Sequence, residues 1–172
     1  MEENPELQAL SREKLIELIG IYAKNWLAHD GLWFQSIERK HGMDEAMFHN
    51  VEAWRAFTVI EAQRIKAFLE LPEHPGLEGL ARALRLRFYG SLNEQSFERH
   101  ENRLVYRNVN CRVQAARERK GLPFHPCKSV GIVEYGGFAK TIDARIACRC
   151  LSCHPDAVES PTGCAWEFTL ED

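Results

Sequence analysis

The chain has 172 residues, of which 45% are hydrophobic and 27% are charged, and its net charge is −3. This length is most simply one domain, residues 1–172, and the composition lacks the basic excess that nucleic-acid binding requires. No segment approaches the roughly 20 apolar residues of a membrane span, and the acidic start does not resemble a secretion signal. We therefore expect a cytoplasmic protein with neither a nucleic-acid nor a membrane partner.

Residues 1–90 are predicted to be helical. Ser11 is expected to cap a first helix, because apolar residues follow it at helical spacing: Leu15, Leu18, Ile19, Tyr22 and Trp26. Asp30 is expected to cap a second helix that ends at Gly42. A third helix, from Asp44, carries an apolar stripe as far as Pro72: Trp54, Phe57, Ile65, Phe68 and Leu69. A short helix then covers residues 77–88.

Residues 91–172 are predicted to alternate between strands and helices. Strands are expected over 95–100, 103–110, 144–151 and 165–170, and helices over 111–120 and 128–139. The basic run within 112–120 is interpreted as a solvated helix face, and Asp143 as an ion-pair partner of Arg145. The sequence thus predicts an α+β fold, in which an N-terminal helical layer packs on a four-stranded antiparallel sheet in the order β-β-α-α-β-β.

Four of the six cysteines have the spacing of a metal site. Cys150 and Cys153 form a C-x-x-C pair, Cys127 precedes it and Cys164 follows it. Each lies at an expected element end, and the segment between Cys153 and Cys164 is polar, so packing alone would hold it poorly. We predict a closed all-cysteine zinc site with a structural role.

Alternatives to this ligand set remain open. Cys148 is expected to share a sheet face with Cys150, and His125 and His154 adjoin the cysteines, so any of the three can replace a ligand. The thiols can also be ordinary buried side chains or a redox pair at Cys150 and Cys153. Cys111 is separate, and its position at a helix start is expected to lower its pKa.

The cysteine pattern resembles the 4-vinyl reductase domain family, which includes the ligand-sensing domains of phenol-responsive transcription activators. The resemblance covers residues 95–170 and implies a zinc site with Cys150 where the phenol sensors have glutamate. The stretches 111–114, 127–131 and 164–168, with the segment 42–46 and Trp54, are also similar to a family of uncharacterised prokaryotic cytosolic proteins. That family is remotely related to 2-amino-thiazoline-4-carboxylate hydrolases.

The resemblance further implies a ligand pocket between the helical layer and the sheet, lined by aromatic side chains. The sequence offers the following residues, which are equally typical of a core: Trp26, Trp33, Phe34, Trp54, Phe57, Tyr106 and Trp166. No phosphate-binding loop, nucleophile elbow or zinc-protease motif is present. Cys111 and Glu134 are weak candidates for catalysis, and His29, Asp30 and His41 are weaker still.

Three functions follow as hypotheses. The first is a zinc-stapled domain that binds a small organic molecule as a sensor or accessory protein, with its long amphipathic helices forming a homodimer. The second is a hydrolase-like enzyme acting on a small heterocyclic or carboxylate substrate. The third is a structural interaction module. An enclosed cavity favours the first two hypotheses, because an interaction module does not need one.

Overall fold

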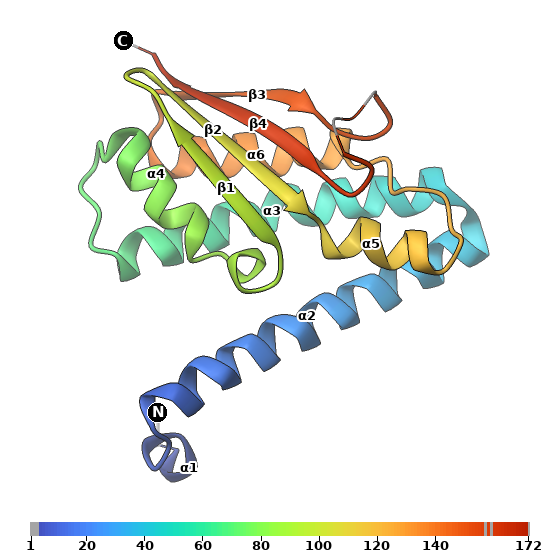
Figure 1. Cartoon of the computed structure of the whole chain (residues 1–172), viewed down its shortest axis with the longest axis horizontal. Coiled ribbons are helices and arrows are strands. Elements are labelled where there is room, and N and C mark those ends of the chain that lie inside the picture. The colour runs from blue at the N-terminus through green and yellow to red at the C-terminus, as the bar shows by residue number, and fades with distance from the viewer. Residues whose placement is uncertain (1–3, 157, 159, 172) are drawn as a thin grey trace.

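The computed structural model describes residues 4–156, 158 and 160–171, and it confirms the α+β class (Figure 1). The helical half and the mixed half follow one another as expected. The elements are α1 (Pro5–Gln8), α2 (Arg12–His41), α3 (Met43–Phe68), α4 (Gly76–Arg85), η1 (Phe88–Ser91), β1 (Glu94–Arg99), β2 (Arg103–Asn110), α5 (Arg112–Arg119), α6 (Lys128–Ile142), β3 (Ile146–Ser152) and β4 (Cys164–Leu170).

Helix α2 is one continuous helix, which corrects the prediction of a break at Asp30. Its start is as expected, because the Ser11 side chain accepts a hydrogen bond from the Lys14 backbone N–H at 3.3 Å. No proline interrupts the segment around Asp30, so the backbone hydrogen bonds continue past it. The helix ends at Gly42, whose φ of 90° suits glycine. The N-terminal half of α2 lies apart from the sheet (Figure 1).

Helix α3 begins at Met43, close to the predicted start, and packs along α6. The close approach depends on Gly137, because an added Cβ there would lie 2.8 Å from Thr58 Cγ2. The Thr58 hydroxyl also donates to the Glu134 carbonyl at 2.8 Å. Phe68 was expected on the buried stripe, but it is 79% exposed, whereas Ile65 and Leu69 on either side of it in the sequence pack against the core. Helix α4 is also shorter than predicted and leaves Phe88 to η1.

The sheet is antiparallel with strand order β1-β2-β4-β3, so the final strand inserts beside β2. Trp166 of β4 lies opposite Tyr106 on β2 and Cys150 on β3. Both Trp166 and Phe168 are buried in the core, where α4 and α6 cover this face (Figure 1). Glu167 lies between these two residues on β4, and it forms ion pairs with arginines on the neighbouring strands. The four predicted strands are confirmed within two residues at each end.

Helix α5 has the solvated basic face that its sequence suggested at Arg112, Arg119 and Lys120, and Arg117 is the exception. Arg117 is buried, and its guanidinium forms two hydrogen bonds with the Glu38 carboxylate, at 2.9 and 2.7 Å. A paired guanidinium can be buried because the carboxylate offsets the loss of hydration. This bidentate pair fastens α5 to α2. The expected pair of Asp143 and Arg145 is confirmed, with Nη2 and Oδ2 2.9 Å apart.

No helix in the described part of the chain combines the length and the apolar character needed to cross a membrane.

Candidate functional site

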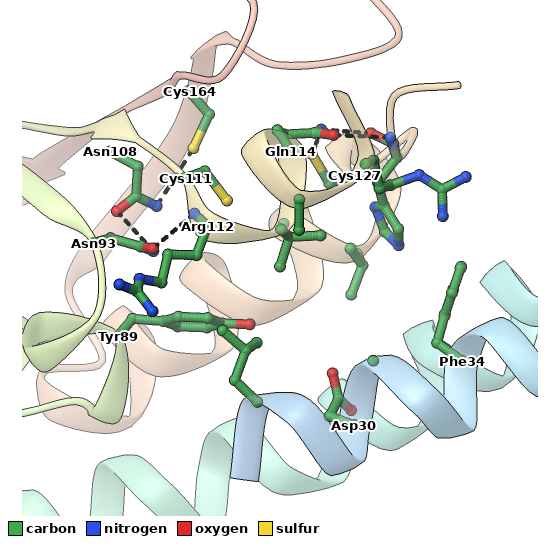
Figure 2. A pocket seen from close by; sticks show the side chains of 18 of the residues that line it. Asp30, Phe34, Tyr89, Asn93, Asn108, Cys111, Arg112, Gln114, Cys127 and Cys164 are labelled. Atoms are coloured by element: carbon green, nitrogen blue, oxygen red, sulfur yellow. Dashed lines mark hydrogen bonds between the residues drawn. The ribbon is translucent and has the colours of Figure 1, made fainter. Parts of the chain in front are cut away.

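A cavity of about 660 Å³ lies between α2, α5 and the first turns of α6. Its wall also includes Trp54 of α3, Tyr89 of η1 and the adjacent ends of β2 and β4. Figure 2 shows Asp30 on α2 facing Cys111 and Gln114 across this space. The volume lies in the range of small-molecule binding sites.

Three of the four predicted metal ligands line this cavity. Cys127 is the N-cap of α6, Cys153 follows β3, and Cys164 is the first residue of β4. The Sγ atoms of Cys127 and Cys153 are 3.6 Å apart. Cys150 lies on β3 and packs against the core, but it is not part of the cavity lining. The fold therefore brings thiols from separate elements to one end of the cavity.

Nitrogen donors surround the thiols that face the cavity. Gln114 Nε2 lies 3.3 Å from the sulfur of Cys127, and Asn108 Nδ2 lies 3.6 Å from that of Cys164. The hydrogen bond from Cys153 lowers the pKa of Cys127 to about 5, and the nearby His125 and Gln114 side chains act in the same direction. Hydrogen bonds from Cys127 and Cys164 raise the pKa of Cys153, so Cys153 holds the shared proton. The environment thus favours thiolate at the two ends of the cluster.

A glycine on α6 lets Trp166 form the floor beneath these thiols. A Cβ added at Gly131 would lie 2.4 Å from Trp166 Cζ2, which is far inside a van der Waals contact. The buried indole Nε1 has no aligned hydrogen-bond partner among the described residues, and it contributes to lowering the pKa of Cys164 after the larger effect of Cys153. The ring therefore touches both the helix backbone and the sulfur cluster.

No three His, Cys, Asp or Glu side chains in the described ranges form a group able to hold a metal ion as they stand. The zinc site stays a prediction. Of the alternative ligands, Cys148 packs against the core and burial raises its pKa to about 12. His154 stacks on Phe124, and its Nε2 lies 2.8 Å from the Pro161 carbonyl. His125 lines the cavity, and its Nδ1 has no hydrogen-bond partner in the described structure.

A buried ionic triad lies behind the cavity wall. Arg87 is 2% exposed, its Nε donates to Glu61 Oε2 at 2.8 Å, and its Nη2 lies 2.7 Å from Glu134 Oε1. That second contact is an ion pair without hydrogen-bond alignment, because Nη2 and Oε1 both lack a hydrogen-bond partner among the described residues. Burial acts to lower the pKa of Arg87, but the charges of the two glutamates outweigh it and raise that pKa. One guanidinium therefore serves two carboxylates.

Both catalytic candidates line the cavity, but their ionisation differs from the expectation. Cys111 is the N-cap of α5, yet burial raises its pKa to about 12, so the neutral thiol dominates near pH 7. The prediction of a lowered pKa is wrong, because burial outweighs the helix N-terminus. For Glu134, burial raises the pKa to about 7. Asp30 lines the cavity as well, whereas His29 and His41 are not among its lining residues.

Only some of the aromatic residues predicted to contact a ligand line the cavity. Trp54 and Trp166 line the cavity, as does Phe34. Trp26 instead stacks on Phe57 with ring centroids 5.5 Å apart, and neither lines the cavity. Trp33 is 66% exposed, and the buried Tyr106 lies behind the wall, where its hydroxyl donates to Asn108 Oδ1 at 2.7 Å.

Several lining residues were not anticipated, notably Tyr89, Asn108 and Gln114, whereas Tyr135 lines the cavity beside the expected Glu134. Asn108 Nδ2 donates to the Tyr135 hydroxyl at 3.0 Å, so these polar groups form part of a network under the thiols. The sequence offers one hint of this wall, because the charged Arg87 directly precedes the aromatic pair Phe88 and Tyr89. Its buried partner Glu61 is distant in the sequence, so the pattern alone does not predict that Arg87 is buried.

Together these features define an α+β protein with a cavity whose lining includes both thiols and carboxylates. The chain belongs to a family described as "Family of unknown function (DUF6125)", whose pattern matches residues 8–170. Neither the curated proteins nor the solved structures contain a match.

Proposed function

We propose that this protein binds a small organic molecule in the cavity between α2, α5 and α6, as a sensor or accessory protein. The observation that carries the proposal is the cavity itself, about 660 Å³ in volume and lined by a mixture of aromatic and polar side chains. Binding sites for small molecules combine these features, since apolar walls supply affinity and a few polar groups fix orientation.

We propose further that a zinc ion binds at the cavity floor, with Cys127, Cys150, Cys153 and Cys164 as its ligands. Two thiols of this set are 3.6 Å apart, close to the roughly 3.8 Å edge of a tetrahedron with Zn–S bonds of ~2.3 Å. The N–H groups of Gln114 and Asn108 near the sulfurs suit metal-bound thiolates, which are acceptors. A metal there requires the sulfurs of Cys164 and Cys150 to close on this pair. Its role is to fix the loop 153–164 against the start of α6.

A relation to the 4-vinyl reductase domain remains part of this proposal. It is supported by the β-β-α-α-β-β order of residues 94–170 and by the thiols at the ends of those elements. The remoter relation to 2-amino-thiazoline-4-carboxylate hydrolases motivates the alternative, a hydrolase-like enzyme. In favour of that alternative, Glu134 has a pKa of about 7 and shares the cavity with Cys111.

Filling the cavity is expected to abolish ligand binding. Gly31 lines the cavity, and a Cβ there would meet only Gln35 Nε2, at 3.9 Å, so Gly31→Phe places a ring in open space. Gly20→Phe is the matched control, because Gly20 lies on the same helix, has equal room and is not a lining residue. A fragment library screened by ligand-observed NMR should give compounds whose affinity falls at least about tenfold in Gly31→Phe alone. Compounds that bind all three proteins equally would overturn the proposal.

The homodimer is proposed to form through the N-terminal half of α2. Ile16, Ile19 and Tyr22 are each 59% exposed on this half, which lies apart from the sheet (Figure 1). A second copy can bury the same stripe by self-complementary helix pairing. Light scattering coupled to gel filtration should give twice the chain mass, and Ile19→Glu should give the single mass. Phe68→Glu, on the exposed end of α3, is the control and should stay dimeric. A wild-type monomer at high concentration would contradict this prediction.

A further inference from the structure

The charges that line the cavity are separated by depth. Glu134 is 7% exposed, and Asp30 is half-buried, with burial raising the pKa of its carboxyl. The cations of the lining lie at the rim, where water and salt screen them, or are already paired, as Arg117 is with Glu38: the exposed rim cations are Lys24, Arg112, Arg119 and Lys120. Of the other titratable groups in the less exposed part of the lining, the carboxylates of Glu134 and Asp30 outnumber the imidazole of His125, so this part of the cavity is acidic.

Arg87 does not fully neutralise that part of the cavity. It is shared between Glu61 and Glu134, so the triad carries one excess negative charge when both glutamates are ionised. The side chain of Glu134 is 9% exposed, and its buried Oε1 contacts Arg87 without hydrogen-bond alignment, so the carboxylate is held by charge more than by hydrogen bonds. A buried carboxylate with unused hydrogen-bond capacity is unfavourable unless a donor reaches it. Of the two glutamates, only Glu134 lines the cavity, so a donor can arrive from that side.

Asp30 and Glu134 both line the cavity, and so does Tyr89. Apart from burial, the charges of Glu134 and Asp30 are the largest influences that raise the pKa of the Tyr89 hydroxyl. Figure 2 shows the ring of Tyr89 reaching into the cavity above α2, with Asp30 pointing up from that helix. Tyr135 and Trp54 line the same region, so an incoming cation meets aromatic faces as well as carboxylates.

We propose that the ligand of this cavity carries a protonated amine, bound where Glu134 and Asp30 face Tyr89. The ammonium group donates to the carboxylates and supplies the positive charge that the triad lacks. This inference rests on the proposed small-molecule function and names the chemical class of the ligand. The position of the amine also places the remainder of the ligand towards the thiols and the cationic rim.

The test compares benzylammonium with benzyl alcohol, a neutral probe of the same shape, by ligand-observed NMR titration at about pH 8, where the amine is charged and Glu134 is ionised. We expect the wild-type protein to bind benzylammonium roughly tenfold more tightly than the alcohol. Glu134→Gln and Asp30→Asn should each reduce this preference. Glu52→Gln is the matched control, because Glu52 is an exposed carboxylate of α3 that neither belongs to the triad nor lines the cavity, so the preference should persist.

Equal or weaker binding of benzylammonium by the wild-type protein overturns the inference, and so does the binding of neither probe. An equal loss of preference in Glu52→Gln also overturns it, because the effect would then come from the overall charge of the protein and not from the cavity. If Glu134→Gln does not fold, Asp30→Asn still decides the question, since Asp30 lies outside the triad. Neutral or anionic fragments that are excluded by Gly31→Phe would leave the proposed function standing while this inference fails.

Discussion

Protein purified without added metal is expected to contain about one zinc ion per chain, and Cys153→Ser is expected to lose it. Cys153 has the sulfur of Cys127 at 3.6 Å and influences the pKa values of Cys127 and Cys164, so it occupies the middle of the cluster. Structural zinc contributes roughly 10–16 kcal/mol of apparent binding free energy in small zinc domains. A larger fold depends on the metal less, but its loss should lower the melting temperature clearly.

Elemental analysis and thermal unfolding, with and without a chelator, check this prediction. Cys148→Ser is the control, because Cys148 packs against the core and does not line the cavity. It should keep the metal. Loss of zinc in Cys148→Ser but not in Cys150→Ser would change the ligand set. Wild-type protein that is free of metal and equally stable in chelator would contradict the zinc proposal and direct attention to redox chemistry of the thiols.

Arg87→Met is expected to destabilise the protein more than any substitution on the exposed surface. It leaves Glu61 and Glu134 buried without their shared counter-ion, and removing one partner of a buried ion pair typically costs about 3–5 kcal/mol. Arg85→Met is the matched control. Arg85 is exposed, and its guanidinium lies 4.2 Å from the Phe97 ring centroid, so its loss should cost about 1 kcal/mol or less. Urea unfolding of the three proteins measures the difference.

The pH dependence of this loss has a definite sign. Burial raises the pKa of Glu134 from 4.5 to about 7 in the folded wild-type protein, so the folded state binds this proton more tightly than the unfolded state. The stability contributed by that proton is fully present below the unfolded pKa and is lost as the pH rises through about 7. Removing Arg87 strengthens this preference for the protonated form. The destabilisation by Arg87→Met should therefore be smaller at about pH 5 than at pH 8, and an equal loss at both would contradict the role of the carboxylates.

The α+β class and all four strands were accessible from the sequence because alternation and turn residues are local signals. The break at Asp30 was wrongly placed for the same reason. An aspartate preceding apolar residues has the local character of a cap, but only the continuing backbone hydrogen bonds reveal that it lies inside α2. Phe68 shows a related limit, since neighbouring apolar residues of one helix can face different sides, and here Leu69 packs against the core while Phe68 is exposed.

The thiol cluster was the part of the site that sequence spacing anticipated, because strand and helix ends bring cysteines together whenever the topology is right. The carboxylates of the lining were much harder to foresee. Glu134 and Asp30 resemble exposed helix residues until the fold places them on a common cavity, and Cys111 seemed reactive until burial was known. The wall is assembled from segments that are distant along the chain, and no local pattern states which segments meet.

The contact between Gly131 and Trp166 has a consequence for how this family diversifies. Because a Cβ at position 131 would lie 2.4 Å from the indole, substitutions at positions 131 and 166 are expected to be coupled. Homologues that keep the indole must keep the glycine, and a larger residue at 131 can become fixed only after the ring at 166 has shrunk. Such paired changes would reshape the cavity floor under the thiols on an unchanged scaffold.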